Sequence, residues 1–265
     1  MTVGTHDLRE LAIDIAREAG GLAKRRRIAG VEFAATKSTL ADIVTEADRE
    51  VEELIRRRLR QERPEDAFLG EESGEQTGTS AFTWVVDPID GTVNYAAGIP
   101  AYCVSIAVVD GRDPDTWHDV AGAVYAPVLD EMFSAARHEG AWLGNRRLAV
   151  SVMPSAGALL GTGFGYDPET HDADLATVRR VMSVARDVRR MGAAALDLAY
   201  VAAGRLDGYF ERGLQLWDFA AGAMLVREAG GVCQRLDEPG VARRMTIAGD
   251  AALVERVRER VLAPQ

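Results

Sequence analysis

The sequence is poor in the side chains that carry sulfur and imidazole chemistry. It contains 2 cysteines, Cys103 and Cys233, and 4 histidines among 265 residues. Two cysteines cannot build a disulfide framework or a thiolate cluster, so we expect two small buried side chains in a reducing compartment. The histidines stand apart among polar neighbours, without the paired spacing of zinc ligands. The sequence therefore disfavours a disulfide-stabilised fold and a zinc enzyme.

Positive charge and long apolar runs are also scarce. There are 31 Lys and Arg against 41 Asp and Glu, which gives a net charge of −10. This balance disfavours nucleic acid and anionic membranes as partners and favours small molecules. The opening MTVGTHDLRELAIDIAREAG carries acids among its apolar residues and has neither a signal-peptide core nor a membrane-length span. We therefore predict a cytoplasmic protein.

What the sequence does have is enough apolar material for a large core. Of the 265 residues 47% are hydrophobic, which suits one large domain or two coupled halves. Apolar residues at helical spacing predict helices over residues 7–27 and 42–64. After Gly70, short Val-rich and aromatic runs predict a sheet region with a hairpin across APVLDE, residues 126–131.

The pattern of predicted secondary structure changes from Ala158 onward. We predict a strand over residues 158–166 and a helix over residues 175–190, followed by helix, strand, helix, strand and helix. The chain is thus expected to combine α+β and α/β parts. We place an N-terminal α+β half at residues 1–146 and a C-terminal α/β half at residues 147–265, the second half completing the site begun in the first.

Several short stretches of the sequence resemble known catalytic motifs without matching them. RHEG, residues 137–140, lies in a predicted hairpin and is interpreted as a surface turn. GTGFG, residues 161–165, has its third glycine misplaced for a dinucleotide loop and is also interpreted as a turn. No Ser lies in a Gly-x-Ser-x-Gly elbow, and Cys103 lacks a following arginine cradle. These patterns exclude the common routes of nucleophilic catalysis.

Carboxylates remain as the chemically active groups. In VVDPIDGTVNY, Asp87 and Asp90 follow a predicted buried strand, and their side chains can converge at its end. Convergent carboxylates repel unless a hard cation such as Mg²⁺ joins them, and the Ile89 carbonyl offers a further oxygen ligand. Gly91 allows close backbone approach, and a short helix from Thr92 would present N–H groups to a phosphate. The same pattern is compatible with a tight turn capped by aspartate.

Two other acids stand in comparable places. Glu71 in FLGEESGE follows a short apolar run, and Asp218 in LQLWDFAAG lies at the start of a predicted helix. Taken alone, the first is compatible with an ordinary loop acid and the second with a helix cap.

Together, GEES, DPIDGT and LWDFAAG resemble the acidic motifs of the inositol monophosphatase family. TKS and DIVTEAD upstream and GAAALDLAYVAAGRLDGYFERG downstream extend the likeness over nearly the whole chain. The last stretch is most similar to bacterial inositol-1-monophosphatases of the SuhB type. The resemblance implies a layered αβαβα sandwich, as in fructose-1,6-bisphosphatase, and frequently a homodimer. It also implies a lithium-sensitive, Mg²⁺-dependent phosphatase with two to three ions in each site.

Carried over residue by residue, the resemblance implies roles at matching positions. The implied ligands are Glu71, Asp87 and the Ile89 carbonyl for one Mg²⁺, and Asp87, Asp90 and Asp218 for a second, with Glu71 also near a third. The implied catalytic residues are Glu71, Thr92 and Asp48, which orient the attacking water. The implied substrate-binding residues are Lys37, Asp90, Gly91, Thr92, Ala194, Glu211 and Asp218. Ala193 stands where many relatives carry Ser or Thr, which removes one hydroxyl from the substrate side.

The implied reaction is hydrolysis of inositol 1-phosphate by direct attack of a metal-activated water. Three other small phosphate monoesterases of the same family stay open as alternatives: histidinol-phosphate phosphatase, fructose-1,6-bisphosphatase and nucleotide 3′-phosphatase. A non-catalytic regulatory binding protein on the same fold is the alternative of another class. A family member that no longer catalyses the reaction would be expected to have lost some of these acids.

Overall fold

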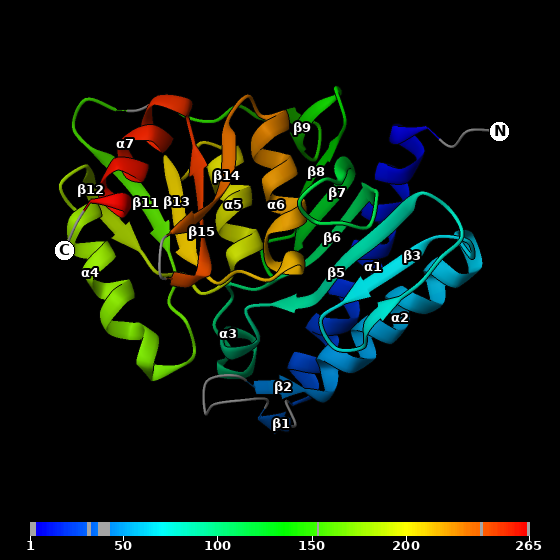
Figure 1. Ribbon diagram of the computed structural model, residues 1–265. Helices are drawn as coiled ribbons and strands as arrows, with labels where there is room; N and C mark the ends of the chain where they lie inside the picture. Colours follow the sequence, from blue (N-terminus) through cyan, green and yellow to red (C-terminus); the bar gives the residue numbers. More distant parts are fainter. Residues whose placement is uncertain (1–3, 31–32, 37–42, 153, 239–240, 264–265) are drawn as a thin grey trace.

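The computed structural model describes residues 4–30, 33–36, 43–152, 154–238 and 241–263. Two large sheets, stacked between helices, dominate these residues (Figure 1). The order of layers is α1 and α2, the 8-stranded sheet, α5 and α6, the 5-stranded sheet, and α4 with α7. The layered αβαβα sandwich expected from the resemblance is confirmed.

The 8-stranded sheet has the order β10-β9-β8-β7-β6-β5-β3-β4. Its strands are β3 (Ala67–Gly70), β4 (Gly74–Gln76), β5 (Phe82–Asp90), β6 (Cys103–Asp110), β7 (His118–Ala126), β8 (Glu131–Ala136), β9 (Gly140–Leu143) and β10 (Arg146–Arg147). All neighbours are antiparallel except β3 and β5, which run parallel. Because β3 and β5 are parallel, their carboxyl ends meet at one edge, where Glu71 and Asp87 lie.

Two amphipathic helices cover the outer face of this sheet. They are α1 (Thr5–Ala29) and α2 (Glu46–Glu62), between which lies a small antiparallel pair, β1 (Phe33–Thr36) and β2 (Ile43–Thr45). In α1, Leu8, Ile15 and Ala19 recur at helical spacing, are buried and pack with the sheet. The helix α2 begins in a capping box between Thr45 and Asp48.

The 5-stranded sheet has the order β12-β11-β13-β15-β14. Its strands are β11 (Ala158–Thr162), β12 (Ala185–Arg189), β13 (Gly208–Arg212), β14 (Val232–Glu238) and β15 (Val241–Gly249). The outer helices are α4 (His171–Val181) and α7 (Ala251–Leu262), and the inner ones are α5 (Ala194–Ala202) and α6 (Leu216–Glu228). Every residue of α5 is buried, as its position between two sheets requires.

Several local expectations are confirmed. The hairpin across residues 126–131 joins β7 to β8, and RHEG is a turn between β8 and β9. Cys103 and Cys233 are both free and buried. A short helix, α3 (Thr92–Ala97), begins directly after β5.

Other expectations are wrong. The predicted helix over residues 175–190 ends at Val181, and residues 185–189 form the edge strand β12 beside β11. Its exposed Asp and Arg residues suit a helix surface and an edge strand equally, so pairing with β11 decides the outcome. A single strand was expected before the last helix, but the structure has an antiparallel pair, β14 and β15. The end of β14 and the start of β15, where the two strands are joined, are rich in polar residues. The strand from Ala158 ends at Thr162, so residues 163–166 lie in a loop.

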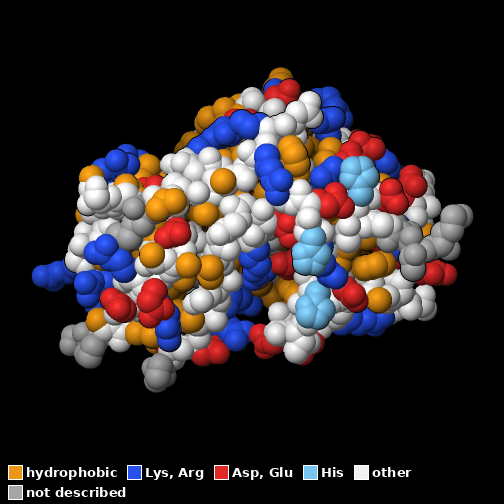
Figure 2. Space-filling view, turned by 90° about the horizontal axis from the view of Figure 1, so that it is seen from above, with side chains coloured by type: hydrophobic (Ala, Val, Ile, Leu, Met, Phe, Trp, Pro, Cys, Tyr) orange, Lys and Arg blue, Asp and Glu red, His pale blue; other side chains and the backbone are white. Residues whose placement is uncertain are grey.

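The surface mixes charges of both signs. In the view from above, Lys and Arg side chains alternate with Asp and Glu side chains over the face, and a hollow near its middle contains both (Figure 2). Among the helices that the structure describes, none combines the length and apolar character needed to cross a bilayer.

Candidate active site

The end of β5 places two aspartates beside a helix start. Asp87 and Asp90 are 2% and 7% exposed, and the pairing of β5 with β6 changes register between them. Gly91 follows with a φ of 93° as the residue before α3. A Cβ on Gly91 would lie 2.9 Å from the carbonyl oxygen of Ala101. Glycine is therefore required here both by backbone conformation and by space.

Acids from two other elements face the same space. Glu71 follows β3, and its N–H donates to the Val86 carbonyl on β5 at 3.2 Å. Asp218 is the third residue of α6, and its Oδ2 accepts the N–H of Gln215 at 2.7 Å. The carboxylate at this position therefore belongs to a capping box rather than to the N-cap residue itself.

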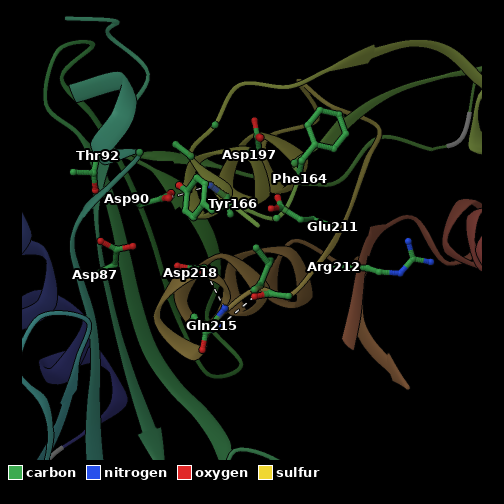
Figure 3. Close-up of a pocket in the computed structure, with 18 of the residues that line it drawn as sticks. Asp87, Asp90, Thr92, Phe164, Tyr166, Asp197, Glu211, Arg212, Gln215 and Asp218 are labelled. Carbon is green, nitrogen blue, oxygen red and sulfur yellow. Dashed lines mark hydrogen bonds between the residues drawn. The ribbon is translucent and has the colours of Figure 1, made fainter. Parts of the chain in front are cut away.

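These residues line one cavity of about 500 Å³ (Figure 3). We call Glu71, Asp87, Asp90 and Asp218 the acidic wall. The loop wall lies opposite and consists of residues 163–170, residues 211–213 and Arg243. Of the residues predicted for the site, the cavity is lined by Glu71, Asp87, Ile89, Asp90, Gly91, Thr92, Ala194, Glu211 and Asp218.

Backbone N–H groups hold the aspartates of the acidic wall. The Oδ1 of Asp87 accepts the N–H of Ile89 at 3.0 Å. The two oxygens of Asp90 accept the N–H groups of Ala194 and Ala195, at 3.1 and 2.7 Å, at the start of α5. The negative carboxylate thus lies at the positive end of that helix. Ala194, predicted to contact the substrate, also positions Asp90.

Asp48 reaches the cavity through Thr92. The Thr92 hydroxyl lies 3.3 Å from Asp48 Oδ1 and 3.1 Å from the Ile89 carbonyl, and donates to one of them. Thr92 and Asp48, both of which the resemblance implies to be catalytic, therefore lie in contact. Lys37 lies outside the described residues.

The family profile agrees with this arrangement of acids. The profile described as "Inositol monophosphatase family" matches residues 5–263. The chain belongs to the inositol monophosphatase family.

Individual members of the family are similar over most of the chain. It is 46% identical to an inositol-1-monophosphatase of Rhizobium meliloti over 195 residues, 72% of this chain and 71% of that protein. It is 41% identical to the Nus factor SuhB of Escherichia coli over 231 residues, 86% of this chain and 84% of that one. The crystal structure of SuhB from Bartonella henselae superposes with a TM-score of 0.86 at 37% identity, covering 96% of this chain and 98% of that chain. Mycobacterium tuberculosis SuhB gives 0.81 at 38% identity, covering 97% and 96%.

Burial and mutual repulsion disfavour the charged forms of the aspartates in and beside the cavity. Burial, followed by the charges of neighbouring acids, raises the pKa of Asp87 and that of Asp218 well above the ordinary value. Burial also raises the pKa of Asp90, to about 6, although N–H groups of α5 counteract it. Burial raises the pKa of Asp48 to about 7. As a group, these acids are all ionised at neutral pH only if cations compensate their charge.

The donor chemistry of the acidic wall fits Mg²⁺. Its side chains offer only carboxylate oxygens, and the Ile89 carbonyl adds a neutral oxygen. In the described part of the chain, no three His, Cys, Asp or Glu side chains converge closely enough to hold one ion between them. Mg²⁺ commonly binds through one or two carboxylates and completes its coordination with water and substrate oxygens, so the oxygens of the acidic wall still fit this ion.

The cavity is also lined by residues that sequence reasoning missed. On the loop wall they are Phe164, Gly165, Tyr166, Asp167, Thr170, Arg212, Gly213 and Arg243, and outside it they are Arg190, Asp197, Leu214, Gln215 and Trp217. Asp197 is 1% exposed, and its Oδ1 has no hydrogen-bond partner among the described residues. Its sequence signal was an acid inside the otherwise apolar run AAALDLAYVA. The sequence patterns place residues 163–166 in the strand from Ala158 and, within GTGFG, in a turn, and neither pattern indicates a place in the site.

Glu211 is the predicted site residue on the loop wall. It lies on β13 and accepts a hydrogen bond from the Tyr209 hydroxyl. Burial raises the pKa of Glu211 to about 7, against the opposing effect of Tyr209. Its carboxyl group faces the cavity opposite Asp87 and Asp90 (Figure 3).

Proposed function

We propose that this protein is a Mg²⁺-dependent phosphomonoesterase that hydrolyses inositol 1-phosphate to inositol and phosphate. The observation that carries the proposal is the cavity itself, in which Glu71, Asp87, Asp90 and Asp218 face Glu211. The first four suit metal ions, and the last suits ring hydroxyls. Relatives named inositol-1-monophosphatase support the choice of substrate.

Two to three Mg²⁺ ions would be held by the oxygens of the acidic wall. The proposed ligands are Glu71, Asp87 and the Ile89 carbonyl on one side and Asp87, Asp90 and Asp218 on the other, with Glu71 near a third ion. When bound, such ions lower the pKa of a water ligand to about 7 and stabilise the departing oxygen in an in-line displacement.

The protein's own residues would orient the reactants. Asp48 fixes the Thr92 hydroxyl, and Thr92 with Glu71 orients the attacking water. The backbone N–H groups of Gly91 and Thr92 receive the phosphate, and Lys37 is proposed as a further substrate-binding residue. This division needs no histidine and no covalent nucleophile.

On the alcohol side, Glu211 would accept hydrogen bonds from ring hydroxyls, and Asp90, Ala194 and Asp218 would border the ring. A carboxylate acceptor strengthens such bonds. Because the small-molecule substrate is an anion, the negative chain relies on its cations to attract it.

A phosphate-release panel tests the proposal. The substrates are inositol 1-phosphate, histidinol phosphate, fructose 1,6-bisphosphate and adenosine 3′,5′-bisphosphate, each with Mg²⁺ and with EDTA. With Mg²⁺ we expect the highest kcat/KM for inositol 1-phosphate. With EDTA we expect no phosphate release from any of the four esters. A preference for one of the other three esters would assign the alternative activity named by that ester. A Li⁺ titration tests the proposed lithium sensitivity, and sedimentation tests the proposed homodimer.

A regulatory function is the second candidate, because the Escherichia coli relative is named a Nus factor. The complete set of acids favours catalysis, and release of phosphate from no ester would favour the regulatory alternative. We further propose that the protein is cytoplasmic and that the division into residues 1–146 and 147–265 marks two cooperating halves. The two free cysteines support a reducing compartment.

A further inference from the structure

A buried carboxylate on α4 connects the separate parts of the loop wall. Asp174 is 3% exposed. Its Oδ2 accepts the N–H of Gly165 at 3.1 Å, and its Oδ1 accepts the Arg243 guanidinium at 2.7 Å. Gly165 belongs to the loop after β11, and Arg243 belongs to β15. One side chain therefore ties a loop and a strand that are far apart in sequence.

Arg212 brings β13 into the same network. It follows Glu211 directly, so the two side chains point to opposite sides of the strand, as Figure 3 shows. Its guanidinium donates to both carboxylate oxygens of Glu238 at 2.7 Å and to the Thr177 hydroxyl at 2.6 Å. It also lies 3.8 Å from Asp174. The strand that carries Glu211 is thus held from behind by charged groups.

The loop packs directly against the groups that this network holds. A Cβ on Gly163 would overlap the Glu211 carboxylate, and a Cβ on Gly165 would lie 2.5 Å from a guanidinium nitrogen of Arg243. The Arg243 guanidinium also donates a hydrogen bond to the Arg212 carbonyl, at 3.3 Å. The place of Glu211 in the cavity therefore depends on where the loop lies.

We propose that Asp174 is a positioning residue that sets which leaving alcohol the cavity accepts, by fixing the loop over residues 163–170 against Glu211. Asp174 does not line the cavity, so it acts through Gly165 and Arg243. Its negative charge also separates two guanidinium groups that would otherwise repel each other. The inference rests on the proposed phosphatase function.

The test compares wild type with Asp174→Asn on two esters. Asparagine keeps the size of the side chain but removes the charge that holds Arg212 and Arg243. We expect kcat/KM for inositol 1-phosphate to fall about tenfold, chiefly through KM, and kcat/KM for the ring-less glycerol 2-phosphate to fall less than about twofold. The Mg²⁺ concentration for half-maximal rate should stay unchanged. Hydrogen exchange of the amides in residues 163–170 should become about tenfold faster.

Asp66→Asn is the matched control. The Asp66 side chain is also buried, at 1% exposure, with Arg63 Nε at 2.7 Å and the Trp84 indole nitrogen at 2.8 Å, and Asp66 does not line the cavity. We expect the control to lower Tm while leaving both the ester ratio and the exchange of residues 163–170 at wild-type values. If Asp174→Asn does not fold, Arg243→Gln is the second variant. It removes one charged partner of Asp174, and because the Arg243 side chain is already 25% exposed, the change is easier for the fold to accommodate. It should shift the ratio in the same direction.

Three results would overturn the inference. Equal losses on both esters would place Asp174 with the metal chemistry, and no loss on either ester would reduce it to a stabilising ion pair. Unchanged exchange in residues 163–170 would show that Asp174 does not fix the loop. The exchange readout needs no substrate, so it decides this point even if wild type releases no phosphate. That failure would instead count against the proposed function.

Discussion

On the acidic wall, backbone N–H groups hold Asp87, Asp90 and Asp218, whereas on the loop wall charged side chains hold one another. Backbone donors at strand and helix ends are fixed by the fold itself. Side-chain networks can be rearranged by single substitutions without changing the fold. This difference suits the proposed division of tasks, in which the acidic wall holds the metal ions in a constant geometry and the loop wall selects the alcohol.

The largest expected effect comes from Asp87→Asn on the acidic wall. Asp87 is the one carboxylate proposed to bind both principal ions, and an amide removes its charge. We expect kcat with inositol 1-phosphate to fall by about 10³-fold or more, on the scale of losing a major electrostatic contribution in an active site. Phosphate release at saturating Mg²⁺ measures it, with circular dichroism to verify folding. A folded variant that keeps substantial Mg²⁺-dependent activity would remove Asp87 from the metal site.

A smaller and selective effect is expected from Glu211→Gln on the loop wall. If Glu211 accepts hydrogen bonds from ring hydroxyls, each is worth roughly 1.5–3 kcal/mol. We expect kcat/KM for inositol 1-phosphate to fall about 10- to 100-fold and that for glycerol 2-phosphate much less. Kinetics with both esters and a Mg²⁺ titration measure it. A raised Mg²⁺ requirement would move Glu211 to the acidic wall, and no loss would make it a structural residue.

Gly163→Ala should sharpen the comparison with a still smaller effect. The new methyl group would displace the Glu211 carboxylate, which lies at the end of a flexible side chain and can shift. We expect KM for inositol 1-phosphate to rise about threefold, less than Glu211→Gln because the acceptor is moved and not removed. Gly21→Ala is the matched control for the steady-state kinetics, because Gly21 lies in helix α1 and a Cβ there would meet only the Arg25 guanidinium, at 3.4 Å. A kcat loss without a KM change would contradict the prediction.

The smallest expected effect is on stability and depends on pH. An acid whose pKa is raised in the folded state binds its proton more tightly when folded, so its destabilising effect is present above that pKa and declines toward the ordinary value. For Asp90 and Asp48 the folded-state pKa values are about 6 and about 7, against 3.8. In EDTA, Tm should therefore rise by several degrees from about pH 8 to about pH 5.

With Mg²⁺ present, this rise should shrink or reverse, because the ions favour the ionised acids. Calorimetric scans with EDTA and with Mg²⁺ measure both cases, and Asp48→Asn should flatten the EDTA curve. A Tm in EDTA that falls as the solution is acidified over this range would contradict the assigned repulsion.

The sequence predicted the acidic wall better than the loop wall for a physical reason. Asp87, Asp90 and Gly91 lie together in one short motif, so local strand and turn patterns indicate their arrangement. The helices α1 and α2 were equally visible, because their apolar spacing is strong.

The missed features depend on partners that are distant in the chain. Residues 185–189 become a strand only by pairing with β11, and Asp174 gains importance only from Gly165, Arg212 and Arg243. Neither partnership leaves a periodic signal, so tertiary contacts were needed to reveal it.

The hydrogen bonds from the start of α5 to Asp90 tie the larger sheet to a helix that also packs on the smaller sheet. A chain that has folded only its first sheet lacks these donors, and it also lacks Asp218 and Glu211. The proposed phosphatase activity therefore requires that both sheets have folded and that α5 and α6 have docked. During refolding, its recovery should follow the docking of α5 and α6 and should lag behind the recovery of secondary structure.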